Sequence, residues 1–174
     1  MIRYRRLVGP IAVTIVAIVV GACAPAPRTA PPPAAGPVAV PAGSTWQDQM
    51  LASINANRAA AGRAPLSRCA SLDAAAQTHS ADQAATNTMT HSGSDGSTIG
   101  VRANRAGYVG WTALGENVAA GYSSVDAVMT GWMNSSGHKA NLLSPSYTHV
   151  GLGLVNSASG RPYWTQDFGA TGRC

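Results

Sequence analysis

The sequence predicts an α+β fold in which helices cover a β-sheet. Three stretches carry apolar side chains at the spacing of an amphipathic helix, and a C-terminal stretch carries them at alternate positions, as in a strand. Helical stretches followed by a hairpin are typical of a sheet with helices packed on it. A chain of 174 residues is long enough for one such domain with appendages.

Each predicted helix has an apolar stripe and recognisable ends. The first begins near Ser44-Thr45-Trp46-Gln47, which has the spacing of a capping box, and Gly62 ends it. The second runs from about residue 71 to 87, and the third runs from residue 125 to the Ser-Ser-Gly break at 135–137. The stripes consist of Trp46, Met50 and Ile54, of Leu72, Ala75, Ala76 and His79, and of Val125, Val128, Met129 and Trp132.

The C-terminal part of the chain changes to a period of two. Val150, Leu152 and Leu154 alternate with His149 and two glycines, and a turn at 156–160 leads to a second strand at 163–168, which predicts a β-hairpin. Residues 89–121 show no sustained period and contain seven glycines. We therefore expect long loops there, and loops of that length tend to be functional.

Residues 1–22 have the features of a bacterial lipoprotein signal peptide. Three arginines precede 16 uncharged residues, which as a helix would span about 24 Å, less than a bilayer core of about 30 Å. Val20-Gly21-Ala22-Cys23 resembles a lipobox, in which the cysteine is acylated and becomes the mature N-terminus. Two alternatives remain: ordinary cleavage after Ala22-Cys23-Ala24, which Pro25 disfavours and which would release a secreted protein, or an uncleaved anchor.

An exported protein with a membrane-bound, outward-facing domain follows from the lipoprotein interpretation. Residues 23–44 are rich in alanine and proline and predict an extended tether, which leaves 45–174 as the domain. The net charge of +5 comes mostly from the N-terminal segments, because residues 44–174 hold eight basic and seven acidic side chains. A nearly neutral domain argues against nucleic-acid binding.

Export to an oxidising compartment also determines which roles we expect for the three cysteines. With Cys23 assigned to the lipid, Cys69 and Cys174 remain in an oxidising compartment, so we expect a disulfide between them; a reduced pair is the alternative. A bridge over that separation stabilises the fold by about 4–5 kcal/mol in the chain-entropy model. It would also leave no free thiol for nucleophilic catalysis.

Few side chains are candidates for chemistry. Glu116 is the only glutamate, and it lies between apolar residues. Among the four histidines, His79 falls on a helical stripe and is expected to be packed, and His149 is expected at the surface or in a second layer. His91 and His138 follow predicted helix ends, where side chains can converge on a cleft.

Five segments in this order resemble the bacterial branch of the CAP superfamily, which groups cysteine-rich secretory proteins, antigen 5 and plant pathogenesis-related proteins. They are MTHS, GENVA, GWMNSSGHKANLL, HVGLG and YWTQDFG, at residues 89–92, 115–119, 131–143, 149–153 and 163–169. The resemblance implies a three-layer α-β-α sandwich with a mainly antiparallel sheet. It also implies a cleft in which His91 and His138 face each other beside Glu116.

In that family such paired histidines can hold a divalent metal, usually zinc. Many members have a second glutamate where this chain has Ser135. His91, His138 and Glu116 remain. Glu116 is then either a third zinc ligand or a hydrogen-bond acceptor that fixes the tautomer of one histidine. The role as hydrogen-bond acceptor fits the family better. A third option is a serine nucleophile at Ser92, Ser135 or Ser136, with Glu116 orienting a histidine.

Three classes of function remain open. The leading one is a monomeric envelope protein, not primarily an enzyme, whose cleft binds a small apolar ligand, a peptide or an envelope component, with zinc as the candidate cofactor; the resemblance supports it because family members include sterol- and lipid-binding proteins. The second is a secreted hydrolase, a peptidase or esterase, that uses a metal or the His/Glu pair. The third is a tethered structural module that binds a protein partner. The fold alone does not decide among them.

Overall fold

The computed structural model describes residues 43–174; the predicted signal peptide, the Cys23 acylation site and nearly all of the tether lie outside the described residues. The elements are α1 (Trp46–Ala60), β1 (Ser67–Arg68), α2 (Ala70–Thr86), α3 (Ile99–Arg105), β2 (Ala113–Ala120), α4 (Val125–Asn134), α5 (Ser136–Leu142), β3 (His149–Asn156) and β4 (Pro162–Ala170). The predicted α+β class is confirmed.

The strands form one sheet in the order β1-β3-β4-β2. β3 and β4 are the predicted hairpin, and β2 pairs with β4 in the antiparallel sense. The short strand β1 pairs with β3 in parallel, so the sheet is mixed rather than purely antiparallel. β2 lies at one edge of the sheet, with only one neighbouring strand among the described residues.

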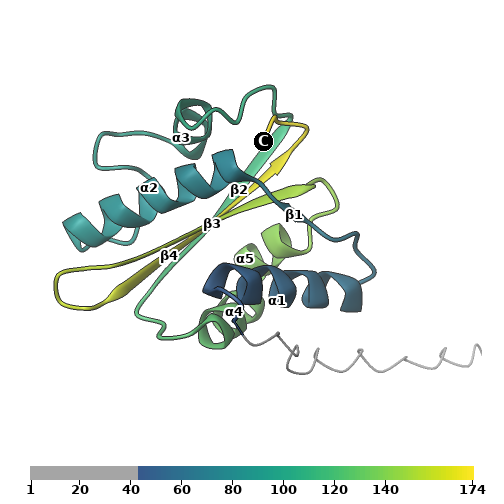
Figure 1. The fold of residues 1–174 in the computed structure, drawn as a ribbon, viewed down its shortest axis with the longest axis horizontal. Helices are drawn as coiled ribbons and strands as arrows, with labels where there is room; N and C mark the ends of the chain where they lie inside the picture. Colours follow the sequence, from purple (N-terminus) through teal and green to yellow (C-terminus); the bar gives the residue numbers. More distant parts are fainter. Residues whose placement is uncertain (1–42) are drawn as a thin grey trace, which may run out of the picture. The chain divides into compact units, whose positions relative to one another are not determined.

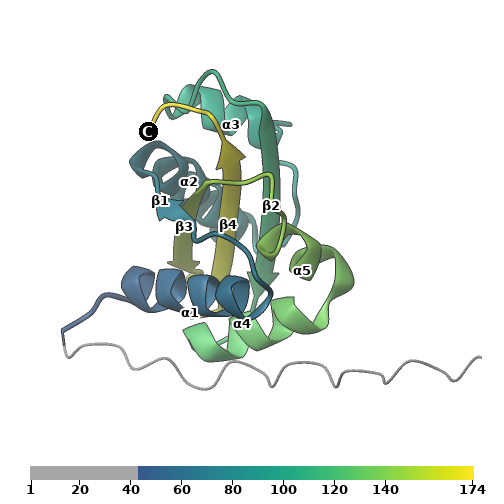
Figure 2. The same ribbon diagram turned by 90° about the vertical axis from the view of Figure 1, so that its right-hand side faces the viewer.

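Helices cover both faces of the sheet (Figures 1 and 2). α2 crosses one face, with α3 at one end of it, while α1, α4 and α5 lie against the other face. This arrangement is the three-layer sandwich that the resemblance implied. Each face of the sheet therefore needs side chains that fit a helix.

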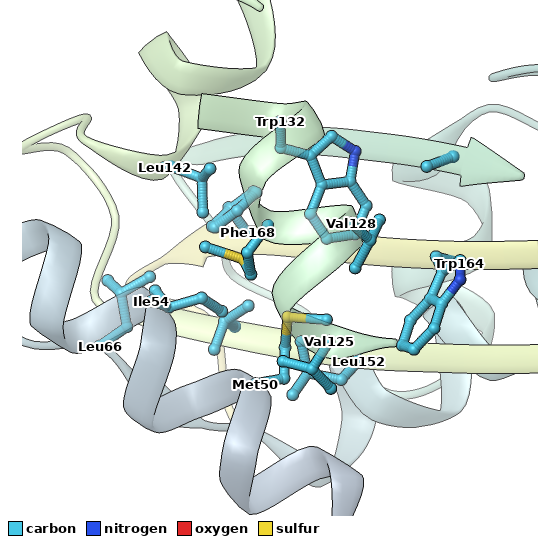
Figure 3. Close-up of a cluster of buried hydrophobic side chains, with 13 residues drawn as sticks. Met50, Ile54, Leu66, Val125, Val128, Trp132, Leu142, Leu152, Trp164 and Phe168 are labelled. Atoms are coloured by element: carbon cyan, nitrogen blue, oxygen red, sulfur yellow. The ribbon is translucent and has the colours of Figure 1, made fainter. Parts of the chain in front are cut away.

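The larger core lies between the sheet and α1 and α4 (Figure 3). Trp132 of α4, Phe168 of β4 and Ile54 of α1 are at most 1% exposed. The helical stripes predicted from the sequence supply much of this cluster, whose thirteen buried members are Met50, Ile54, Leu66, Ala119, Val125, Val128, Met129, Trp132, Leu142, Val150, Leu152, Trp164 and Phe168. A second cluster of Cys69, Leu72, Ala103 and Tyr108 packs on the side of α2 and α3.

β3 divides its side chains between the two layers as its alternation predicted. Val150 and Leu152 enter the larger core, whereas Gly151 and Gly153 face α2. A Cβ atom on either glycine would overlap the backbone of Leu72 or Ala76 in α2. The absence of side chains therefore lets this helix lie directly on the strand.

Helix ends agree with the predictions, with one shift. The capping box is made by Thr45 and Asp48, one residue later than the predicted Ser44 pattern. The backbone turns left-handed at Gly62 after α1 and at Asn87 after α2. Such conformations end a helix at little cost for glycine and are tolerated by asparagine.

The expectation that residues 89–121 lack regular structure was wrong, because they contain α3 and β2. The third predicted helix, α4, ends at the Ser-Ser-Gly break as expected, but α5, which was not predicted, begins there after the single extended residue Ser135. β2 escaped detection because helices cover both faces of the sheet, so its buried residues 116–119 do not alternate with polar ones. The helix α3 has seven residues and is too short for a sustained period.

The predicted disulfide between Cys69 and Cys174 is present, with a Cα–Cα distance of 5.1 Å. Cys69 is the N-cap residue of α2 and is 1% exposed, whereas Cys174 is the last residue of the chain. The bridge fastens the end that follows β4 to the beginning of α2.

Candidate functional site

The site is built around Glu116 on the edge strand β2. Its side chain is 4% exposed. In the register of the sheet, Glu116 lies beside Asp167 of β4, which lies beside Gly151 of β3. Because cross-strand neighbours share a face, Glu116 points to the side of the sheet that α2 covers.

His91, in the segment between α2 and α3, contacts this carboxylate. Its Nδ1 lies 2.7 Å from Oε1 of Glu116, and its side chain is 63% exposed. An ionised carboxylate only accepts, so Nδ1 carries the hydrogen and the lone pair of a neutral ring stays on Nε2. The sequence prediction that Glu116 fixes a histidine tautomer agrees with this geometry.

Arg102 of α3 is the buried counter-ion, and the sequence analysis missed it. Its Nη2 donates to Oε2 of Glu116 at 2.5 Å and to the carbonyl oxygen of His91 at 3.2 Å, and its Nη1 donates to the carbonyl oxygen of Ser97 at 2.8 Å. One guanidinium therefore holds both the carboxylate and the backbone beside the exposed imidazole. The available signal was that a lone glutamate among apolar residues needs a cation when it is buried.

His79 of α2 lies behind Glu116 and is completely buried, as its position on the stripe predicted. Its Nε2 donates to the carbonyl oxygen of Thr90 at 2.8 Å, one residue before His91. The same nitrogen is 3.9 Å from Oε2 of Glu116, too far for a hydrogen bond. Burial lowers the pKa of the His79 imidazole, so the ring stays neutral and helps to fix the backbone that leads to His91.

His138 approaches the same edge from the opposite layer. The sequence predicted a position just beyond a helix end; His138 does follow the end of α4, but it lies inside the next helix, α5. Asn117 Nδ2 donates to its carbonyl oxygen at 3.2 Å, and Asn141 Nδ2 donates to the carbonyl oxygen of Glu116 at 3.1 Å, so α5 is fastened to β2. Burial lowers the pKa of His138, and the charge of nearby His91 lowers it further.

Asp167 is a second buried carboxyl that the sequence analysis missed. It is completely buried, and neither of its oxygens has a hydrogen-bond partner among the residues that the structure describes. Burial, and then the charge of Glu116, raise its pKa well above the ordinary value. Its position inside the strand motif of β4 gives no local sign of this, because the adjacent carboxylate comes from β2.

The remaining sequence candidates are not joined to this centre by hydrogen bonds. No serine hydroxyl in the described part of the chain bonds to the ring of His91 or His138, and Ser135 is the N-cap residue of α5. His149 is half-buried, with Nδ1 3.0 Å from the hydroxyl of Tyr108. Of the two positions predicted for His149, the surface or a second layer behind the site, the structure has the second.

The donor set fits a metal only in part. Residues 43–174 do not bring three or more His, Cys, Asp or Glu side chains together in a way that could hold a metal ion. The site offers the free Nε2 of His91 and the imidazole of His138, with Glu116 and Arg102 behind the first ring. Two imidazoles are fewer than the three protein ligands of most catalytic zinc sites.

Comparison with known sequences shows the family to which a protein with this fold and site belongs. The pattern of the cysteine-rich secretory protein (CAP) family matches residues 51–168, and the chain belongs to that family. The uncharacterised Bacillus subtilis protein YkwD is 33% identical over 126 residues, which cover 72% of this chain and 47% of YkwD. A membrane protein of the same bacterium, YlbC, is 42% identical over 62 residues, which cover 36% of this chain and 16% of YlbC.

Solved structures agree with the fold. An extracellular protein with an SCP domain from Bacillus anthracis superposes with a TM-score of 0.65 and 31% identity, over 71% of this chain and 39% of that one. An outer surface protein of Borrelia burgdorferi gives the same TM-score at 19% identity, over 72% and 92% of the two chains, which supports the fold alone. This chain spans less than half the length of the curated relatives that it matches.

No helix within residues 43–174 is long and apolar enough to cross a membrane.

Proposed function

We propose that this protein is exported, is anchored to the bacterial membrane through acylated Cys23, and binds a small apolar ligand or envelope component at the edge of β2, near His91 and His138. The observation that carries the proposal is the orientation of His91. Its ring is 63% exposed while Glu116 holds Nδ1, so Nε2 is presented outward as a fixed acceptor. Such preorganisation favours binding because less freedom is lost.

An exposed apolar side chain lies close to this imidazole in the sequence. Met89, two residues before His91, is 52% exposed. An exposed flexible thioether in the same segment as a polar acceptor suits a ligand that is mostly apolar and carries a hydroxyl or another donor. The ligand class therefore rests on the family likeness together with this pair of side chains.

Binding is tested by native mass spectrometry of the full chain after incubation with lipids extracted from a bacterial envelope. We expect a retained lipid and a raised melting temperature, both lost when His91 and His138 are replaced together by alanine. His149→Ala is the matched control, because that imidazole bonds to Tyr108 away from Glu116. No retained lipid, or equal retention by the double variant, would refute ligand binding at this place.

Zinc binding is a separate part of the proposal. His91 and His138 would hold the ion, and a bound zinc ion would polarise a donor atom of the ligand. Titration calorimetry with zinc should show weak binding to the wild type and none to the double alanine variant. Equal heats of zinc binding to both proteins would refute the proposed metal site.

The lipid anchor is tested independently of the cleft. In detergent phase partitioning, the wild type should enter the detergent phase, and Cys23→Ser should move the protein to the aqueous phase. Partitioning that does not change in the variant would favour ordinary signal cleavage or an uncleaved segment.

A second candidate is a hydrolase, and the hydrogen bond between His91 and Glu116 favours it. An exposed imidazole oriented by a buried carboxylate is the arrangement of a general base. The hydrolase alternative predicts turnover of a peptide or ester that disappears in His91→Ala and in His138→Ala but persists in His149→Ala. Turnover in all three variants would exclude the pair as the catalytic groups.

A further inference from the structure

A cavity separate from the paired histidines lies between α2, residues 93–97 and α3. Its volume is about 390 Å³, and neither His91, Glu116 nor His138 lines it. This volume falls at the lower end of the range of about 300–1,000 Å³ that is usual for small-molecule sites. The ligand it accepts is therefore small.

The walls carry both signs of charge. Asp82 of α2 and Asp95 of the loop supply two carboxylates, and Arg102 and Arg105 of α3 supply two guanidinium groups. A simple anion is opposed by the aspartates, and a simple cation is opposed by the arginines. A ligand with one charge of each sign meets an attractive partner for both.

The uncharged part of the lining is made mainly of small residues. Ala74 and Ala75 lie on one face of α2, and Ala106 follows α3. Methyl groups of this kind leave room for an apolar body no larger than a short side chain. The hydroxyl groups of Thr78 and Ser97 add neutral hydrogen-bonding capacity.

Unused hydrogen-bonding atoms occur in the same lining. Nδ1 of His79 and Nε of Arg102 have no hydrogen-bond partner within residues 43–174, and both residues are at least 95% buried. Because Nε2 of His79 donates to Thr90, Nδ1 is an acceptor, whereas Nε of Arg102 is a donor. Buried polar groups are nearly always paired, so these two atoms call for a polar partner, which a water molecule or the end of a polar ligand in the cavity would supply.

One ion pair at the rim is exposed and can exchange its partners. Arg105 and Asp95 form an ion pair at 2.6 Å, with their side chains 62% and 51% exposed. Exposed pairs of this kind contribute only about 0–1 kcal/mol, so a ligand that offers each group a new partner displaces the pair at low cost.

We propose that this cavity is a second binding site, which takes a small zwitterion: an ammonium and a carboxylate on a short apolar body, with the size of a dipeptide of small residues. The carboxylate binds to Arg105, which is the arginine of α3 that is not paired with Glu116. The ammonium binds to Asp95 and to Asp82, whose oxygens also accept hydrogen bonds from the backbone N–H and the hydroxyl of Ser94. The apolar body lies against the alanines. The proposal does not depend on the function of His91 and His138.

Titration calorimetry of the full chain with L-alanyl-L-alanine tests the site, supported by NMR shifts of the Ala74, Ala75 and Ala106 methyl groups. We expect binding that weakens by at least about tenfold when the peptide is N-acetylated, and equally when its carboxylate is amidated, because each change removes one charge. The absence of both heat and methyl shifts would overturn the proposal. Equal binding of all three peptides, or stronger binding of a blocked one, would overturn the zwitterion assignment.

Matched variants locate the binding. Ala74→Leu fills the cavity from an exposed position on α2, and Arg105→Ala removes the rim cation; each should weaken binding by at least about tenfold. Ala85→Leu, exposed on the same helix, and Arg68→Ala, whose guanidinium pairs with Asp73, should bind as the wild type does. Equal affinity of Ala74→Leu and Ala85→Leu would place the peptide elsewhere and refute the site. His138→Ala, in a residue of α5 that does not line the cavity, should not change dipeptide affinity, which separates this proposal from the one above.

Discussion

At the scale of single residues, Glu116 contacts a partner through each of its two carboxylate oxygens. Arg102 contacts one carboxylate oxygen from within the protein, and His91 contacts the other from the surface. A carboxylate that is 4% exposed would be costly without a cation, so Arg102 has the larger energetic role. His91, with most of its ring in solvent, contributes orientation more than stability.

This difference predicts unequal effects of two substitutions. Glu116→Gln leaves the Arg102 guanidinium buried without a counter-ion and should lower the free energy of unfolding by about 3–5 kcal/mol in urea denaturation. His91→Ala removes only an exposed partner and should change it by about 1 kcal/mol or less. Similar losses in both variants would contradict the central role of the Arg102 pair.

Asp167 should make the stability of the folded protein fall as the pH rises. Because burial and Glu116 raise its pKa in the folded state, the folded protein holds a proton that the unfolded chain releases above about pH 3.9. The stability contributed by this proton is complete below the unfolded pKa and is lost as the pH rises toward the folded pKa.

Asp167→Asn removes this titration while keeping the shape of the side chain. The variant should equal the wild type near about pH 4 and become more stable than it as the pH approaches about 7. Urea denaturation across this range measures the difference. A constant difference at every pH would show that Asp167 has an ordinary pKa.

At the scale of elements, the contact of α2 with β3 depends on two missing side chains. Gly151→Ala or Gly153→Ala would place a Cβ atom against helix backbone, which cannot rotate away, so we expect a loss of about 1–3 kcal/mol or more. Gly137→Ala in α5 is the control, because no atom lies within 4 Å of its Cβ position, and it should be neutral or slightly stabilising. Equal stability of the three variants in thermal unfolding would mean that α2 can shift away from β3.

The length and burial of the secondary-structure elements explain which site residues could be predicted from the sequence. His91 and His138 lie in segments that resemble the family motifs, and Glu116 stood out as the only glutamate. Arg102 lies in α3, which is too short to show a period, and β2 is buried on both sides and shows no alternation. Their relation to each other was therefore invisible before the sheet and its helices were assembled.

At the scale of the whole molecule, the disulfide holds the C-terminal end to the beginning of α2. Cys69 and Cys174 are 105 residues apart in the sequence, and breaking the bridge frees a loop of most of the domain. Cys174→Ser should lower the free energy of unfolding by about 4–5 kcal/mol. Reduction with dithiothreitol should have the same effect on the wild type and none on the variant; a variant as stable as the oxidised wild type would show that the bridge adds nothing.

The sequence by itself determined the helical stripes, the β3–β4 hairpin, the cysteine pair and the identity of His91, Glu116 and His138, because spacing, alternation and motif are local properties of a chain. Only the tertiary structure decided that Arg102 neutralises Glu116, that Asp167 is buried beside it, and that the α2–α3 cavity combines both signs of charge. Those facts depend on the register of β2 against β4 and on which helix covers which face. Burial and electrostatic pairing are set by neighbours in space, and no local pattern encodes them.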